Sequence, residues 1–312
     1  MGIFPTRILL ATDGSEVAEL AIKTAATLAT STNSELHVIH VGPGLPLYEL
    51  PDYAARFEEV VEEQRQEARR VLDEEVGKVE SSGTAVTEAH LEMDERPDRA
   101  IVELGEKLGV GLVVVGSRGL GGLRRTLVGS VSSSVVRHAH CLVMVVRGEP
   151  LTLPTKVLLA TDGSEDARLA ANTALDLSKK LDSELHVVYV EPMPRRHSAP
   201  LRFAVDLPLE VVERTEEEAK TKLEKLVEKM REEGGEVAQA HPRVGLPAVE
   251  IVALAEELGA GMIVMGSRGL GGIRRALMGS VSEAVVSHAH CPVMVVRPER
   301  ERPAEHEADL LT

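Results

Sequence analysis

Two segments rich in glycine and arginine have the composition of an anion-binding turn. They read GSRGLGGLRRTLVGS from Gly116 to Ser130 and GSRGLGGIRRALMGS from Gly266 to Ser280. Residues without a Cβ let the backbone approach a ligand closely and adopt positive φ. Ser130 is placed to cap the helix that follows, where free N–H groups and a partial positive charge favour phosphate. Each segment therefore predicts a phosphate site.

An aspartate stands where it can complete each site. Asp13 follows the apolar run RILLAT, and Asp162 follows KVLLAT in the second half. In doubly wound sheets, ligands bind beyond the carboxyl ends of the strands, where the strand order reverses. If the first and fourth strands are neighbours, Asp13 and Gly116 face one crevice. An aspartate in TDGS can also simply shape the turn between strand and helix.

The familiar nucleotide signatures are absent, which leaves backbone amides and the serine hydroxyl as the expected phosphate donors. The chain has no G-x-x-x-x-G-K-[ST], and no G-x-G-x-x-G opens its first helix. The arginines of the two segments can neutralise phosphate, form a solvated face or meet an acidic partner surface; they are Arg118, Arg124, Arg125, Arg268, Arg274 and Arg275. Such a site grips a nucleotide without an obvious device for attacking it.

The motif HAHC, which begins at His138 and again at His288, offers imidazole and thiolate groups that suit zinc. Because no second cysteine or paired carboxylate lies nearby in the sequence, we expect no metal site there. We interpret the motif as the end of the fourth helix and the entry to an edge strand. The VMVV of that strand can pair across a two-fold interface.

These motifs occur twice because the chain holds one domain in two copies. Between Gly109–Arg147 and Gly259–Arg297, 28 of 39 aligned positions are identical. The copies join near Gly148–Thr155. We predict domains at residues 1–150 and 151–300, followed by a charged, disordered tail at 301–312.

Short apolar runs alternate with longer segments of helical spacing in each copy. The first copy has expected buried strands at Arg7–Ala11, Leu36–Val41, Ala85–His90, Gly111–Val115 and Leu142–Val146. We predict two tandem doubly wound α/β domains, each a five-stranded parallel sheet in the order 3-2-1-4-5 with helices on both faces. The proline-rich segments Gly42–Arg56 and Glu191–Pro208 are expected to be exposed loops.

Composition excludes several classes of function. The net charge of −15 argues against a nucleic-acid-binding surface, and aromatic residues, at 2%, are too few for base-stacking platforms. The sequence shows no membrane span and no leader, and its two cysteines suit a reducing compartment. We expect a cytoplasmic protein without nucleic-acid or membrane partners.

The pattern G-x2-G-x9-G-S, the strand-ending aspartate of ATDGS and the closing HAHCxVMVVR resemble the universal stress protein family in its tandem form. The resemblance covers about Pro5–Arg147 and Thr155–Arg297. It implies ATP binding, because members with this pattern bind ATP, and a Mg²⁺ ion bridging the phosphates is plausible.

The resemblance implies a role for each matching residue. Asp13 and Asp162 would hold the ribose, and the backbone of Val41 and Val190, where the second strand ends, would meet the adenine. The floor would be Ala11, Thr12, Ala160 and Thr161, with Val115, Gly116, Met265 and Gly266 under the sugar. The phosphates would meet Gly119, Gly129, Ser130 and Val131 in one half and Gly269, Gly279, Ser280 and Val281 in the other.

The copies differ before their third helix. The second has Val244 and Gly245, close to the family pattern, where we align Asp94 and Glu95 of the first. A carboxylate there brings negative charge near an anionic ligand, so we expect the second site to bind ATP more tightly.

We expect an ATP-binding regulator or sensor of the stress response, an internal pseudo-dimer that can also form homo-oligomers. The alternative is a slow ATPase or self-phosphorylating enzyme, with Ser130, Ser280 or Thr126 as acceptor. A third reading is a structural module with empty sites.

Overall fold

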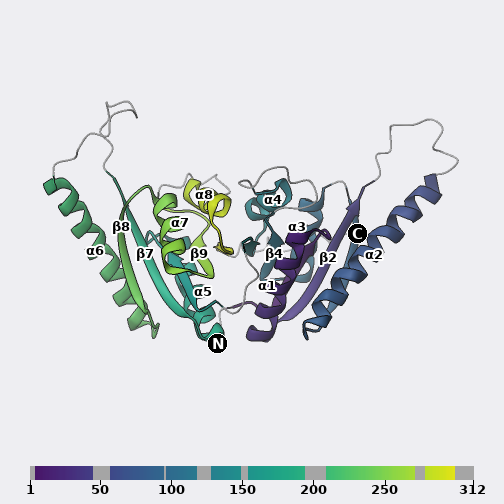
Figure 1. Ribbon diagram of the computed structural model, residues 1–312, viewed down its shortest axis with the longest axis horizontal. Coiled ribbons are helices and arrows are strands. Elements are labelled where there is room, and N and C mark those ends of the chain that lie inside the picture. Colours follow the sequence, from purple (N-terminus) through teal and green to yellow (C-terminus); the bar gives the residue numbers. More distant parts are fainter. Residues whose placement is uncertain are drawn as a thin grey trace, which may run out of the picture.

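The computed structural model describes residues 4–44, 57–94, 96–117, 128–148, 154–193, 209–270 and 278–298. Strands and helices alternate through both halves (Figure 1). The first half contains β1 (Arg7–Thr12), α1 (Glu16–Thr32), β2 (Glu35–Pro43), α2 (Phe57–Ser81), β3 (Glu88–Asp94), α3 (Pro97–Leu108), β4 (Leu112–Gly116), α4 (Ser130–His138) and β5 (Leu142–Val146). The second half contains β6 (Lys156–Ala160), α5 (Glu165–Leu181), β7 (Glu184–Pro192), α6 (Leu209–Glu232), β8 (Gln239–Gly245), α7 (Pro247–Leu258), β9 (Met262–Gly266), α8 (Ser280–His288) and β10 (Val293–Val296).

All ten strands form one sheet, in the order β3-β2-β1-β4-β5-β10-β9-β6-β7-β8. Pairing is parallel within each half, so each half has the predicted order 3-2-1-4-5. The antiparallel pair β5–β10 joins the halves, with Met144 opposite Met294. The predicted fold class and the pairing of the VMVV strands are therefore confirmed.

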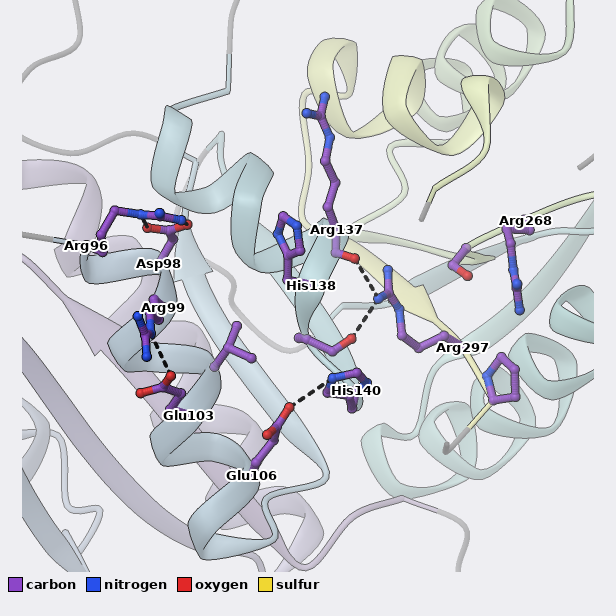
Figure 2. A pocket seen from close by; sticks show the side chains of 14 residues that line it. Arg96, Asp98, Arg99, Glu103, Glu106, Arg137, His138, His140, Arg268 and Arg297 are labelled. Carbon is purple, nitrogen blue, oxygen red and sulfur yellow. Dashed lines mark hydrogen bonds and ion pairs between the residues drawn. The ribbon is translucent and has the colours of Figure 1, made fainter. Parts of the chain in front are cut away.

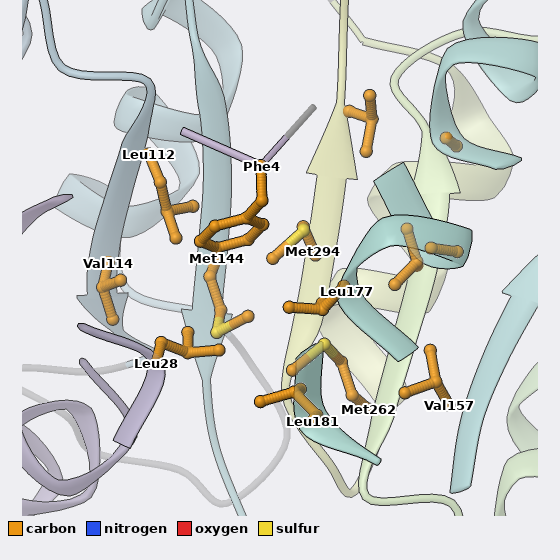
Figure 3. Packing of buried hydrophobic residues seen from close by; sticks show 14 of the residues in the cluster. Phe4, Leu28, Leu112, Val114, Met144, Val157, Leu177, Leu181, Met262 and Met294 are labelled. Atoms are coloured by element: carbon orange, nitrogen blue, oxygen red, sulfur yellow. The ribbon is translucent and has the colours of Figure 1, made fainter. Parts of the chain in front are cut away.

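Helices cover both faces because successive residues of a buried strand point to opposite sides. Ile8 and Leu10 face a core built with α1 and α2 and, in the other half, α5 and α6. Leu9 faces a second core built with α3, α4, α7 and α8. Both cores are continuous across the β5–β10 seam. Figure 3 shows the first of them where the halves meet, including Phe4, Leu28, Met144, Leu177, Leu181 and Met294.

Local sequence explains where the helices begin and end. Ser15 caps α1 by accepting a hydrogen bond from the Ala18 amide at 3.3 Å, and Ser164 caps α5 in the same way. Asn33 and Asp182 end these helices with left-handed backbone. The strand that follows each helix thus starts at a fixed point, and its carboxyl end falls beside that of its neighbours.

Two expectations about the elements were wrong. The third strand is Glu88–Asp94, not Ala85–His90, and it is a half-buried edge strand because charged residues occupy its exposed positions. Gly42, Pro43, Glu191 and Pro192 lie inside β2 and β7 and not in loops. The remaining loop positions of both segments, except the described residues Gly44 and Met193, lie outside the described part of the chain, as does the tail 301–312. The domain boundaries stay a prediction.

Candidate functional site

The carboxyl ends of the first and fourth strands of each half lie side by side, as the site requires. Ala11 pairs with Val115 between β1 and β4, and Ala160 pairs with Met265 between β6 and β9. Asp13 directly follows β1, and Asp162 follows Thr161, the first residue after β6. Each carboxylate accepts a hydrogen bond from the amide two residues on, at 3.1 Å from Ser15 and 3.0 Å from Ser164. The turn-shaping role of these aspartates is therefore real.

In the second half the aspartate also reaches the glycine turn. Oδ2 of Asp162 accepts a hydrogen bond from the Leu270 amide at 2.9 Å. A Cβ on Gly269 would lie less than 3.0 Å from this carboxylate oxygen, so a larger residue would have to displace the Asp162 side chain or the turn. A Cβ on Gly279 would lie 3.3 Å from the Ser267 carbonyl oxygen. At the switch point of the sheet, Asp162 thus contacts Gly269 and Leu270, and Gly279 lies against Ser267.

Helices α4 and α8 begin next to these turns. The N-cap residues are Gly129 and Gly279, with φ of −63° and −79°, and neither contributes a side-chain cap. Ser130 and Ser280 are the first helical residues and are exposed, so Ser130 does not cap α4 as we expected. Gly129 does not adopt the expected positive φ, and neither does Gly116, which ends β4. The first amide groups of both helices thus receive no side-chain cap from their N-cap residues, and helix starts of this kind can bind anions.

An interaction absent from our sequence analysis holds the second turn against α5. Asp166, only 6% exposed, accepts hydrogen bonds from the Ser267 hydroxyl at 2.7 Å and from the Arg268 amide at 3.1 Å. The Arg268 guanidinium also pairs with this carboxylate, at 3.2 Å. Ser164 donates to the Arg268 carbonyl at 3.2 Å. Arg268 therefore has a partner inside its own half.

The sequence signal for this interaction was a single difference between the copies. Asp166 of GSED stands where the first copy has Val17 in GSEV. Gly266 is also required there, because its Cβ would come within 2.8 Å of the Ala167 amide at the start of α5. Arg118 and Gly119, which correspond to Arg268 and Gly269, lie outside the described part of the chain. The same holds for Arg124, Arg125, Thr126, Arg274 and Arg275.

The floor residues differ between the halves. Oγ1 of Thr12 accepts from the Gly14 amide at 3.4 Å, as Oγ1 of Thr161 accepts from the Gly163 amide at 3.3 Å. Thr12 also donates to the buried carboxylate of Glu75 at 2.5 Å. Val41 and Val190 lie two residues before the ends of β2 and β7, not at the ends. The β1–β2 register stops at Thr12 opposite His40, so Val41 lies beyond the last paired residue of β1, while it still pairs with Glu92 of β3.

The structure corrects our alignment of the segments before α3 and α7. Asp94 lies opposite Pro43, and Gly245 lies opposite Pro192, so Asp94 corresponds to Gly245 and Met93 to Val244. The β3–α3 connection has one residue more than the β8–α7 connection, and Glu95 in it lies outside the described residues. Asp94 is not unpaired, because Oδ1 accepts from the Arg96 amide at 2.8 Å. Val131 and Val281 pack on the second core just after the helix starts.

The HAHC motif connects each helix to the strand at the seam. Burial raises the pKa of both thiols, Cys141 and Cys291, to about 12. His140 pairs with Glu106 at 2.9 Å, and His290 lies 3.6 Å from Glu256. As predicted, the motif ends the helix and leads into the strand at the seam.

A hollow of about 450 Å³ lies between the halves, beside α3 (Figure 2). Its charged groups are largely paired with one another, for example Arg99 with Glu103 at 2.6 Å. Ser267 and Arg268 are the lining residues that belong to the second glycine turn. The hollow therefore adjoins the predicted nucleotide site without containing its aspartate. Within the described residues, no helix has the length and apolar character needed to cross a membrane.

Comparison with known proteins agrees with the duplicated fold. The model of the universal stress protein family matches residues 5–147 and 154–297. A universal stress protein of Mycolicibacterium smegmatis is 30% identical over 304 residues, covering 93% of this chain and 97% of that protein. One from Methanocaldococcus jannaschii is 38% identical over 147 residues, covering 47% of this chain and 84% of that protein. The crystal structure of a universal stress protein from Archaeoglobus fulgidus superposes with a TM-score of 0.70 at 26% identity, covering 94% of this chain and 98% of that one. The chain belongs to the universal stress protein family.

Proposed function

We propose that the chain binds ATP, together with Mg²⁺, in both halves and acts as a nucleotide-dependent regulator of the stress response in the cytoplasm. The observation that carries the proposal is the hydrogen bond between Asp162 and the Leu270 amide. It joins a carboxylate suited to a ribose hydroxyl to a glycine turn suited to phosphate, at the position where doubly wound sheets bind ligands. The absence of a Cβ at Gly269 lets the Asp162 carboxylate lie directly against the turn.

The residues of each site would contact different parts of ATP. Asp162 would bind the ribose, while Gly269, Gly279 and Ser280 would direct amides and a hydroxyl at the phosphates. ATP supplies the negative charge that the start of α8 stabilises. The first half would use Asp13, Gly119, Gly129 and Ser130 in the same way.

We further propose that the second site binds ATP more tightly than the first. Gly245 ends β8 without a side chain, whereas Asp94 brings a carboxylate to the equivalent position of β3. Titration of Gly279→Val and Gly129→Val variants with ATP compares the surviving sites. The Gly129→Val variant, which keeps the second site, is expected to bind more tightly. Equal residual affinity, or a tighter Gly279→Val variant, would refute the ranking.

The direct test of the function is to denature the purified chain and identify any released small molecule by mass. Bound ATP that stays intact for hours supports the regulator. Released phosphate or labelled protein after incubation with labelled ATP supports the slow ATPase or self-phosphorylating enzyme. No bound nucleotide, together with no binding of added ATP, contradicts the proposal.

A further inference from the structure

A group of metal-binding side chains lies away from the predicted nucleotide site. His37 is the third residue of β2, and Glu88 and His90 lie on the adjacent edge strand β3. His37 pairs with Glu88 in the parallel register, and His90 is two residues farther along the same face. Nδ1 of His37 and Nε2 of His90 are 3.3 Å apart, and Oε2 of Glu88 is 3.7 Å from that Nε2. All three ligand atoms lie within 4.8 Å of one another.

These distances suit a tetrahedral ion. Zinc binds histidine nitrogen at about 2.0–2.1 Å, so two ligand atoms on a tetrahedral ion are about 3.3 Å apart. The Glu88 oxygen has to move closer to both histidine nitrogens, one of which, His90 Nε2, is 3.7 Å away, and its 62% exposed side chain has room to do so. The two rings now face each other at an interplanar angle of 26°, along a hydrogen bond between their nitrogens. Both rings must turn for a metal to replace the shared proton.

The second nitrogen of His37 supports this arrangement. Nε2 is buried and has no hydrogen-bond partner among the described residues, and the nearest carboxylate oxygen, Oε2 of Glu35, is 4.0 Å away. A histidine that binds metal through Nδ1 carries its hydrogen on Nε2, usually directed at a carboxylate.

The second half provides a natural comparison. His186 and His241 form the same pair, with nitrogens 3.0 Å apart. In the shared register, however, Gln239 stands where the first half has Glu88, and Arg243 stands where it has Glu92. An amide is a weaker ligand than a carboxylate, and the guanidinium adds positive charge. The difference restricts a three-ligand site to the first half.

We propose that His37, Glu88 and His90 form a binding site for Zn²⁺ or a similar divalent transition metal, with water as the fourth ligand. The ion ties the edge strand β3 to β2, and each chain holds one. This site was not visible in the sequence because its ligands come from two strands, with the long helix α2 between them.

The test is calorimetric titration of the metal-free, untagged full-length chain with ZnCl₂ at neutral pH. We expect one zinc ion per chain and a rise in melting temperature when zinc is added. Glu88→Gln should lower the affinity by about tenfold or more, since even outer-shell partners of metal ligands are worth that much. This variant should fold, because the second half carries glutamine at that position.

The matched control is Gln239→Ala at the equivalent position of the second half, which should leave zinc affinity and stoichiometry unchanged. Absence of zinc binding in the wild-type chain would overturn the proposal. Equal zinc affinity of the wild type and Glu88→Gln would overturn it as well.

Discussion

Gly269 lies so close to Asp162 that a Cβ at this position would be less than 3.0 Å from the carboxylate oxygen. In Gly269→Ala the new methyl group must push the turn and Asp162 apart, at a cost of about 1–3 kcal/mol. We expect the ATP affinity of the second site to fall about tenfold, which corresponds to about 1.4 kcal/mol. Titration of the nucleotide-free protein in the Gly129→Val background, where the second site is the one that remains, measures this change.

Gly77→Ala is the matched control, since a Cβ at this position of α2 meets open space. It should leave ATP affinity unchanged and stabilise the helix by about 0.5–1 kcal/mol. An unchanged affinity of Gly269→Ala would show that the turn and Asp162 do not act together.

Asp98 gives the chain a measurable pH dependence. The Arg96 guanidinium, followed by the Ser134 hydroxyl, holds the pKa of this carboxyl at about 2, well below its ordinary value. A carboxyl group whose pKa is depressed in the folded state stabilises the protein at pH values above its ordinary pKa. That stability is lost as the pH falls toward 2. Because Arg96 is exposed, solvent screens the pair, and Asp98→Asn should cost only about 1 kcal/mol at pH 7. Urea unfolding should show that the difference in unfolding free energy between Asp98→Asn and wild type becomes smaller from pH 7 to pH 3. A constant difference, or one as small as that of the exposed-pair control Glu103→Gln, would contradict this assignment.

At the scale of elements, Asp166 fixes the end of β9 to the start of α5. Asp166→Val copies the first half, where Val17 stands, and leaves the Ser267 hydroxyl, 1% exposed, without its acceptor. An unsatisfied buried group costs about 1–3 kcal/mol, which urea unfolding detects. The control Asp73→Ala, on the exposed side of α2, should change stability by less than about 0.5 kcal/mol. If Asp166→Val changes the free energy of unfolding no more than Asp73→Ala does, the turn does not depend on the Asp166 carboxylate.

The elements also show how far sequence reasoning reaches. Continuous Val, Ile and Leu runs predicted β1, β4 and β5 almost to the residue, because these strands are buried on both faces. The edge strand β3 carries Glu, His and Met on a half-buried surface, so its run of apolar residues is broken and its start was misplaced.

The site shows the same limit. Asp162 and the glycine turn are far apart in the chain, and the expected order of strands predicted that they meet, whereas the register of Asp94 depends on a one-residue difference between two connections. The pairs Ala89-His90 and Ala240-His241 were the signal that could have set this alignment. The partnership of Asp166 with Arg268 joins residues 102 apart, and spacing alone does not place such residues together.

At the scale of the whole molecule, the two halves form one structure and not two domains on a tether. The sheet is continuous through β5 and β10, and the Phe4 amide of the first half donates to Asp176 of α5 in the second, at 2.7 Å. Two arginines at corresponding positions cross the seam in opposite directions. Arg147 follows β5 and donates to the Val286 carbonyl of α8 at 2.8 Å, while Arg297 follows β10 and donates to the Ala139 carbonyl after α4 at 2.6 Å. Each arginine thus places a positive charge at the negative end of a helix in the other half.

This crossed arrangement predicts that the arginine of each half stabilises the opposite half. Arg147→Ala removes a donor from the buried end of α8, at a cost of about 1–3 kcal/mol. Amide hydrogen exchange should therefore become faster in α8 of the second half. Exchange in α4, the equivalent helix in Arg147's own half, should change little. Arg297→Ala is the mirror-image control and should quicken exchange in α4 instead. If each variant loosened the helix of its own half, or both helices equally, the arginines would not stabilise the opposite helices across the seam. The halves would then be held together by the β5–β10 pairing and the apolar cores around it.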